Sequence, residues 1–122
     1  MIAIVVDDYD SAIKHYVEDL GFALVEDAPL TSEKRWVVVA PSDQGAKILL
    51  AKATNDQQSA AIGNSTGGRV GFFLYTGNFQ ATYELYRSHG IEFLETPRHE
   101  EYGQVVVFQD HYGNKWDLIE QK

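Results

Sequence analysis

Apolar residues along the chain follow two periodicities, and the elements that they predict occur twice in the same order. In the first half, short apolar runs predict strands at 1–6, 22–26, 35–40 and 47–52, and helical spacing predicts a helix over 11–20 with Asp10 as its N-cap. In the second half, the same patterns predict strands at 69–75, 91–94, 104–109 and 115–120, and a helix over 79–89. Gly21 and Gly90 follow the two helices, where glycine commonly ends a helix. Each half therefore reads as strand, helix and three strands.

The two halves also align residue by residue. Gly21 aligns with Gly90 at a spacing of 69, and Gly45 aligns with Gly113 at a spacing of 68. Around these glycines, three pairs of segments correspond: 46–50 with 114–118, 36–39 with 104–107, and 1–4 with 69–72. Two copies are too few for a solenoid. We therefore predict an α+β fold in which two βαβββ modules form an open barrel-like cleft, with the helices on the outer faces.

The segment between the halves is polar and rich in turn-forming residues. Residues 54–68 contain asparagine, glutamine, serine, threonine and glycine, with room for a helical turn near 60–62. We predict a linker of about 54–68, which joins modules of about 1–53 and 69–122 in a single domain of 122 residues. The linker is also a candidate lid or partner-contacting loop.

Composition excludes several classes of partner and site. The formal charge of -8 would repel a phosphate backbone and an anionic membrane surface, so we expect no nucleic-acid or membrane partner. The chain has no cysteine, which excludes disulfides, thiolate nucleophiles and cysteine-based zinc sites. No apolar run approaches the ~20 residues of a membrane span, and we expect no signal peptide. These features predict a cytoplasmic protein.

Two motifs resemble the vicinal oxygen chelate superfamily, which includes glyoxalase I, bleomycin resistance proteins and extradiol dioxygenases. The first runs from Val5 to Phe22 and contains Asp-Asp-Tyr-Asp-Ser-Ala-Ile, His-Tyr and Leu-Gly-Phe. The second is Tyr102-Gly103 followed by the segment 108–116, with a Phe, an Asp and a Gly-Asn pair. The resemblance implies a homodimer and a divalent metal held by four side chains, one from the first and one from the last strand of each module.

The residues at those four transferred positions argue against the metal. They are Met1, Leu49, Arg69 and Asp117. Leu49 cannot bind a cation, Arg69 would repel one, and Met1 offers a soft thioether that does not suit magnesium, manganese or iron. Asp117 is the only plausible ligand, whereas a catalytic divalent ion normally takes about three protein ligands. We therefore expect no metal and no other cofactor, and we keep a divalent metal as the alternative.

Arg69 and Asp117 are the candidate catalytic residues. We predict that they approach each other as an ion pair in the place of the metal, with guanidinium donors left for an anionic or carbonyl-bearing ligand. An Arg69 electrophile with an Asp117 base would be a metal-independent enzyme. The alternative is a buried ion pair whose two side chains bind only each other and have a purely structural role.

The candidate ligand-binding residues lie at these positions and among the aromatic residues. They are Met1, Trp36, Leu49, Arg69, Tyr102, Phe108 and Asp117. Core packing explains Trp36 and Phe108 equally well. Strand alternation places Leu49 and Asp117 on the cleft face with Ala51 and Ile119, and Ile48 and Trp116 toward the helices. We expect His15 and His89 to be solvated or capping, His111 to serve a turn, and Glu100 and Glu101 to form a solvated charge run.

Two functions follow from the resemblance. The first is a glyoxalase/bleomycin-resistance-like homodimer that binds a small molecule in the cleft without the usual metal; the acidic surface would suit a cationic ligand. The alternative is a metal-dependent lyase of the glyoxalase type or a dioxygenase, which would need a divalent ion for Lewis-acid chemistry. The substrate, and whether a reaction is catalysed, stay open.

Overall fold

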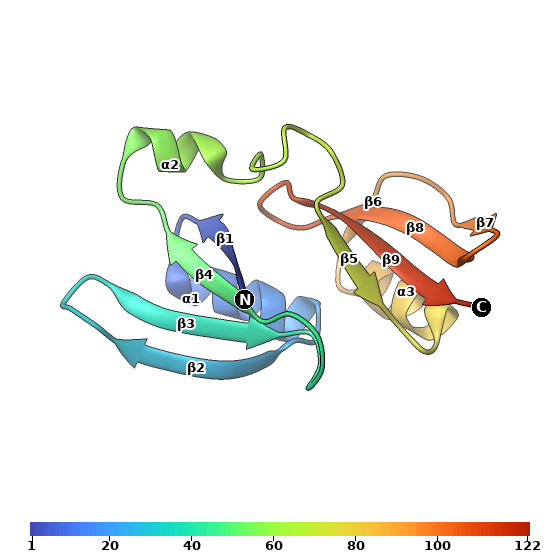
Figure 1. The fold of residues 1–122 in the computed structure, drawn as a ribbon, viewed down its shortest axis with the longest axis horizontal. Coiled ribbons are helices and arrows are strands. Elements are labelled where there is room, and N and C mark those ends of the chain that lie inside the picture. Colours follow the sequence, from blue (N-terminus) through green and yellow to red (C-terminus); the bar gives the residue numbers. More distant parts are fainter. The chain divides into compact units, whose positions relative to one another are not determined.

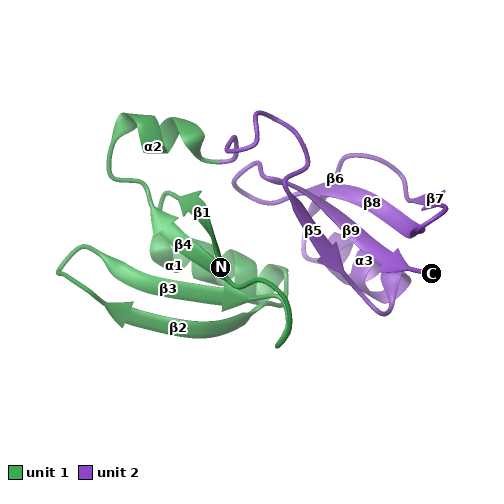
Figure 2. Ribbon diagram, viewed as in Figure 1, with its two compact units in different colours: residues 1–62 green, residues 63–122 purple.

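The chain folds into two compact units in the computed structural model, which describes residues 1–122 (Figure 1). Unit 1 comprises residues 1–62 and unit 2 comprises residues 63–122 (Figure 2). The boundary falls inside the segment predicted as the linker. No helix has the length and apolar character that crossing a membrane would require.

Unit 1 contains a four-stranded mixed sheet in the order β1-β4-β3-β2. The first strand is parallel to the last, whereas the β2–β3 and β3–β4 pairs are antiparallel. The α1 helix continues directly into a wider π-helical segment, η1, and the short α2 helix lies within the predicted linker. The elements are β1 (Ile2–Val6), α1 (Tyr9–Ile13), η1 (Lys14–Asp19), β2 (Ala23–Pro29), β3 (Arg35–Ala40), β4 (Ile48–Lys52) and α2 (Asp56–Ala61).

Unit 2 contains a five-stranded sheet with the order β5-β9-β8-β6, and β7 also pairs with β8. Its first strand is again parallel to its last. The strand β7 was not predicted, since its residues lie in a segment interpreted as a loop. The elements are β5 (Phe72–Tyr75), α3 (Phe79–Ser88), β6 (Glu92–Phe93), β7 (Arg98–Glu100), β8 (Gly103–Gln109) and β9 (Lys115–Gln121). The two units thus have corresponding strand orders, while the predicted cleft stays a prediction.

Strand alternation decides which side chains enter each core. In β4, Ile48 and Leu50 are buried, whereas Leu49 between them is partly exposed. In β9, Trp116 and Leu118 are buried and Asp117 between them is partly exposed. The alternation places Leu49 and Asp117 on the opposite faces of their strands from these buried residues. The predicted division fits the burial in β4, whereas in β9 Ile119, predicted to share the face of Asp117, is buried.

The first helix begins two residues earlier than predicted. Asp8, not Asp10, is the N-cap: its backbone is extended, and its Oδ2 accepts the Ser11 backbone N–H at 2.8 Å. Asp10 instead accepts a hydrogen bond from Arg35. In unit 2, Asn78 caps α3 in the same way by accepting the Ala81 N–H.

One extra residue in the first helix explains why the two halves do not align at a constant spacing. The caps Asp8 and Asn78 are 70 residues apart, whereas Gly21 and Gly90, after the helices, are 69 apart. A π-helical turn accommodates one residue more than the corresponding α-helical path. Consistent with this, the Leu20 N–H donates to the His15 carbonyl, five residues earlier.

Strand register corrects the alignment of the first strands. Ile2 pairs with Ile48 in unit 1, and Phe72 pairs with Trp116 in unit 2. Because Ile48 corresponds to Trp116, Ile2 corresponds to Phe72. Residue 1 therefore corresponds to residue 71, which is a glycine, and not to residue 69 as predicted.

Strand register also corrects the alignment of the third strands, by one residue. Val39 pairs with Ile48, and Phe108 pairs with Trp116. Val39 therefore corresponds to Phe108, whereas the sequence alignment paired it with Val107. The prediction used a spacing of 68 for all three pairs of strand segments, whereas the strand pairings give 70 for the first strands, 69 for the third and 68 for the fourth.

Candidate functional site

A pocket with a volume of about 530 Å³ opens on unit 1. Residues of β1, β3 and β4, the β2–β3 turn, and the segment that begins α2 line it. The volume lies within the range of about 300–1,000 Å³ that is typical of small-molecule sites. The pocket is therefore the candidate binding site in this unit.

The apolar part of the pocket comes from the exposed face of β3 and β4. Trp36, Leu49 and Ala51 contribute to the lining, and all three are partly exposed. Val38 pairs with Leu49, and Trp36 lies two residues before Val38, so Trp36 and Leu49 share a face of the sheet. Two residues predicted from the sequence to bind a ligand are thus brought together.

Hydrogen bonds of the Arg35 side chain stabilise one wall of the pocket. Its Nε and one terminal nitrogen donate to the two carboxylate oxygens of Asp27 at 3.1 and 2.7 Å, and its other terminal nitrogen donates to Asp10 at 2.9 Å. The guanidinium also lies over the Tyr9 ring, 5.2 Å from its centroid. The hydrogen bonds to Asp27 and Asp10 raise the pKa of Arg35. The Arg35 guanidinium therefore already binds two carboxylates within the chain, and these contacts stabilise this wall of the pocket.

The segment before α2 forms a second wall with a fixed conformation. Gln58 Oε1 accepts hydrogen bonds from the Thr54 backbone N–H at 2.8 Å and from its hydroxyl at 2.9 Å. Asn55 caps α2 by accepting the Gln58 backbone N–H at 2.8 Å. The sequence predicted this stretch as a linker and as a candidate lid or partner-contacting loop, and it did not predict that Thr54 and Gln58 line a pocket of unit 1. Its polar composition carried no signal of that role.

Asp117 occupies the corresponding position on the sheet of unit 2. It pairs with Val107 on β8, and its Oδ1 is buried and receives no hydrogen bond within the chain. Burial raises the pKa of Asp117, Arg98 opposes that effect, and Glu95 adds to it. Arg98 is itself bound by Glu95 at 2.9 Å and by Glu100 at 2.6 Å. The charges that act on Asp117 are thus those of a local ion-pair cluster.

The predicted ion pair between Arg69 and Asp117 is wrong. Arg69 is exposed in the loop before β5, where its carbonyl accepts the Thr66 hydroxyl at 2.6 Å, and it forms no salt bridge with Asp117. The prediction failed because β5 begins at Phe72, three residues later than the aligned strand. The roles of Arg69 and Asp117 as catalytic or ligand-binding residues stay predictions.

The remaining predicted ligand-binding residues fall in different environments. Phe108 is fully buried, with its ring centroid 5.5–6.0 Å from those of Tyr86, Phe93 and Trp116, so it packs in the core of unit 2. Met1 and Tyr102 are exposed, and their roles stay predictions.

The Asp…Gly-Asn signature of the second half is a turn held by one carboxylate. Asp110 is buried, and its Oδ1 accepts the backbone N–H groups of Tyr112 and Asn114, each at 3.0 Å. Its Oδ2 accepts the Asn114 amide and the Trp116 indole N–H, each also at 3.0 Å. The motif therefore has a structural role, because it holds the turn between β8 and β9.

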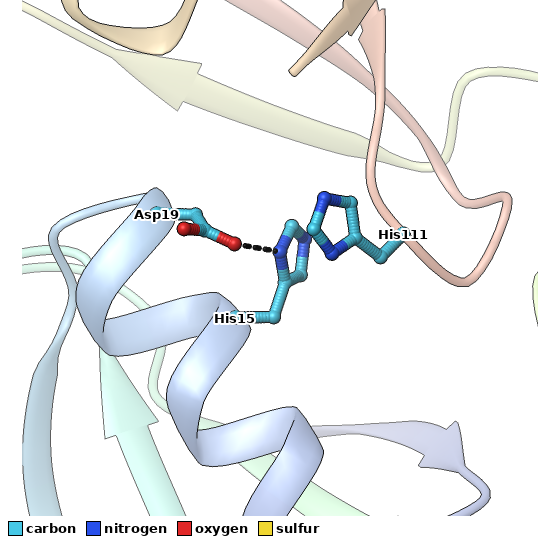
Figure 3. A group of neighbouring side chains, drawn as sticks. All are labelled: His15, Asp19 and His111. Carbon is cyan, nitrogen blue, oxygen red and sulfur yellow. Dashed lines mark hydrogen bonds and ion pairs between the residues drawn. The ribbon is translucent and has the colours of Figure 1, made fainter. Parts of the chain in front are cut away.

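His15 is not solvated as predicted. It is buried, and its Nδ1 lies 3.0 Å from Asp19 Oδ2 one helical turn later (Figure 3). A solvated or capping role was predicted because His15 lies on a helix expected on the outer face of its sheet; the residue lies instead in the π-helical segment η1, where it is buried.

Comparison with known proteins assigns the family. The sequence profile of the Glyoxalase/Bleomycin resistance protein/Dioxygenase superfamily matches residues 1–118. The chain belongs to this superfamily. An uncharacterized protein of Shewanella frigidimarina (strain NCIMB 400) is 47% identical over 121 residues, covering 98% of this chain and 90% of the relative.

Two solved structures of similar proteins support the same fold. UcmS2 has a TM-score of 0.81 and 31% identity, with 97% of this chain and 93% of that chain covered. TnmS3, an antibiotic binding protein from Streptomyces sp. CB03234, has a TM-score of 0.78 and 24% identity, with 99% and 93% covered. This likeness to TnmS3 establishes the glyoxalase-type fold alone.

The superfamily's usual metal does not fit the residues at its ligand positions. With the corrected register, unit 1 supplies Met1 and Leu49, and unit 2 supplies Gly71 and Asp117. Gly71 has no side chain, and a Cβ built at this position would lie 2.4 Å from the Thr66 side chain. One carboxylate is well short of the usual three protein ligands of a catalytic divalent ion.

Proposed function

We propose that this protein binds a small organic molecule in the unit 1 pocket without the superfamily's usual metal. The observation that carries the proposal is the presence of Leu49 in the lining of a pocket of about 530 Å³. Leu49 replaces a side chain that would hold the metal in the family resemblance. An apolar side chain at that position supplies contact area to an organic ligand and removes a donor from the metal.

The side chains around Leu49 support binding over catalysis. Trp36 offers a large aromatic surface beside it, and the walls on both sides are fixed by hydrogen bonds of Arg35 and Gln58. A preformed apolar site loses little conformational freedom when it binds a ligand. The fold is also compatible with this use, since TnmS3 is an antibiotic binding protein of the same architecture.

Metal dependence is tested on the purified protein. We expect elemental analysis to find no stoichiometric divalent metal, and we expect nickel, zinc, manganese and iron(II) salts to leave the unfolding temperature unchanged. A ligand that binds the native state must raise the apparent stability. A stoichiometric metal with a clear stabilisation would overturn the metal-free part of the proposal and favour a lyase or dioxygenase.

Binding in the pocket is tested by fluorescence with aromatic small molecules. Trp36 lines the pocket, and the chain's other tryptophan, Trp116, is buried in unit 2 with its indole bound to Asp110. In a Trp116→Phe protein, the emission therefore reports on Trp36 alone. We expect saturable quenching by an aromatic ligand, and we expect Leu49→Ala to weaken it. Quenching that is not saturable would contradict the proposal.

We also propose that the protein functions as a homodimer. The first strand of each sheet is an edge strand within its unit, with unpaired backbone groups on one side. Light scattering at micromolar concentration should give twice the mass of the 13.7 kDa chain. A monomeric mass would contradict this part of the proposal.

A further inference from the structure

We infer that the unit 1 pocket selects a ligand that combines an aromatic ring with an anionic group. This inference rests on the proposed function, and it concerns the ligand class only. Its basis is the combination of an apolar floor at Trp36 and Leu49 with a rim that contains two lysines, Lys34 and Lys52. The formal charge of -8 predicted a cationic ligand for the chain as a whole, but the local arrangement has the opposite character.

The two lysines are available for a ligand. Both are exposed, and neither forms a salt bridge within the chain. They come from different elements: Lys34 lies at the end of the β2–β3 turn, and Lys52 is the last residue of β4. An ammonium group on each of two elements that line one pocket favours an anion between them.

Other polar groups of the rim add hydrogen-bond donors. Gln58 uses its Oε1 to accept from Thr54, so the amide nitrogen of the same side chain is the group left for a ligand. Thr31 Oγ1 accepts the backbone N–H groups of Glu33 and Lys34 at 3.2 and 2.9 Å, and its hydroxyl proton remains a donor. Donors at a pocket rim complement carboxylate, sulfonate or phenolate oxygens.

Acidic side chains in the pocket lining are fewer than cationic ones, and two carboxylates outside the lining already bind Arg35. Glu33 is the only acidic residue in the lining. The two carboxylates closest to Arg35, those of Asp27 and Asp10, are used by its guanidinium. Lys52 also acts on Asp8, but the pKa of Asp8 is lowered chiefly by the Ser11 backbone and side chain, with Lys52 contributing less. Among the lining residues themselves, the three cations Lys34, Arg35 and Lys52 outnumber the single acidic residue Glu33, so the lining taken alone has a positive formal charge.

A matched pair of dyes tests the ligand class. Anilinonaphthalene sulfonate (ANS) is an anionic aromatic molecule, and N-phenylnaphthylamine (NPN) has the same aromatic skeleton without the charge. Exposed ion pairs contribute about 0.2–1 kcal/mol each, so two lysines should make ANS bind about 10-fold more tightly than NPN. The measurement is quenching of Trp36 emission in the Trp116→Phe protein, together with the rise in dye fluorescence.

Substitution of the lysines separates charge from apolar contact. Lys34→Gln and Lys52→Gln should each weaken ANS binding about threefold and leave NPN binding unchanged. Lys47→Gln is the matched control, because Lys47 is an exposed lysine of the same unit outside the pocket lining. Raising the salt concentration from about 0.05 M to about 0.5 M should weaken ANS binding alone, since ions screen exposed charges. With the rise in dye fluorescence as its readout, this second test can use the natural chain, so it needs no variant that must fold.

The outcomes distinguish the inference from the proposed function. Tighter ANS binding that falls in both lysine variants and with salt supports the inference. Equal affinity of the two dyes with saturable quenching of Trp36 overturns the inference and leaves the proposed function standing. Dye binding that does not quench Trp36 overturns both. An ANS preference that the lysine variants do not change also overturns the inference.

Discussion

Asp110 accepts the indole N–H of Trp116 at 3.0 Å, and this bond joins the turn after β8 to the start of β9. The same carboxylate accepts two backbone N–H groups of the turn and the amide of Asn114. Four donors therefore converge on one buried acceptor group. The register of β9, and with it the position of Asp117, depends on this turn.

Replacement of Asp110 should destabilise the fold. In Asp110→Asn, an amide nitrogen replaces one carboxylate oxygen and faces donors that it cannot accept from. We expect the free energy of unfolding to fall by about 2–3 kcal/mol in urea denaturation, because a buried donor left without its partner costs about 1–3 kcal/mol. Asp43→Asn, in the exposed β3–β4 turn, is the control with the same change of charge. Equal stability of the two variants would refute the role of Asp110.

The two partners of Arg35 should differ in their contribution to stability. Asp27 accepts two hydrogen bonds and has an exposed side-chain fraction of 31%, whereas Asp10 accepts one and is 81% exposed. We expect Asp27→Asn to lower the free energy of unfolding by about 1 kcal/mol, and Asp10→Asn by less than about 0.5 kcal/mol. Thermal and urea denaturation of both variants measure the difference. The reverse order would contradict the assignment of Asp27 as the main partner.

Ligand binding should affect the emission of one tryptophan more than that of the other. ANS should quench Trp36 more strongly than Trp116, because Trp36 lines the pocket whereas energy transfer to the dye falls steeply with distance. Steady-state fluorescence titration of Trp36→Phe and Trp116→Phe, each with a single tryptophan, measures both. Stronger quenching in Trp36→Phe than in Trp116→Phe would place the dye nearer Trp116 and contradict the assigned site.

The burial of Asp117 predicts a pH dependence of stability. Its pKa is raised by burial, so the native state binds more protons than the unfolded state between the ordinary carboxyl pKa and the raised value. The contribution of Asp117 to stability should therefore be most favourable below the ordinary pKa and be lost as the pH rises through the raised pKa. Asp117→Asn cannot ionise and should be more stable than the natural protein at neutral pH.

Thermal unfolding between about pH 3 and about pH 8 tests this prediction, since the window spans ordinary carboxyl titration. The difference between the two proteins should shrink toward the acidic end. Glu101→Gln, at an exposed position of the β7–β8 turn, controls for the loss of one negative charge. A less stable Asp117→Asn at neutral pH would show that the Arg98 charge outweighs the cost of burial.

Several features of the fold follow from local sequence patterns. The runs at 35–40 and 79–89 were predicted as a strand and a helix, and the structure has β3 at Arg35–Ala40 and α3 at Phe79–Ser88. The alternation of Ile48, Leu49 and Leu50 correctly separated buried from exposed faces of β4. Such predictions succeed because apolar periodicity is fixed by the geometry of the element itself.

Other features depend on contacts between distant residues. The sequence placed Arg69 at the first-strand position, but pairing of Phe72 with Trp116 shifts that position to Gly71. The sequence also named Trp36 and Leu49, yet it did not find Lys34, Lys52 or Gln58 beside them. Lys34 lies in a turn, Lys52 is the last residue of β4 and Gln58 lies in the short helix α2, so no periodic pattern relates the three residues to one another.

The sequence by itself thus determined most of the strands, the two longer helical segments, their order and the family resemblance, because these depend on residue types and local spacing; it missed β7 and the π-helical segment η1. The tertiary structure decided the strand register, the hydrogen-bond partners of Asp110 and Arg35, and the lining of the pocket. The physical reason is that register arises from hydrogen bonds between strands far apart in the chain. A single additional residue, such as the one accommodated by η1, changes the spacing without leaving a local signal.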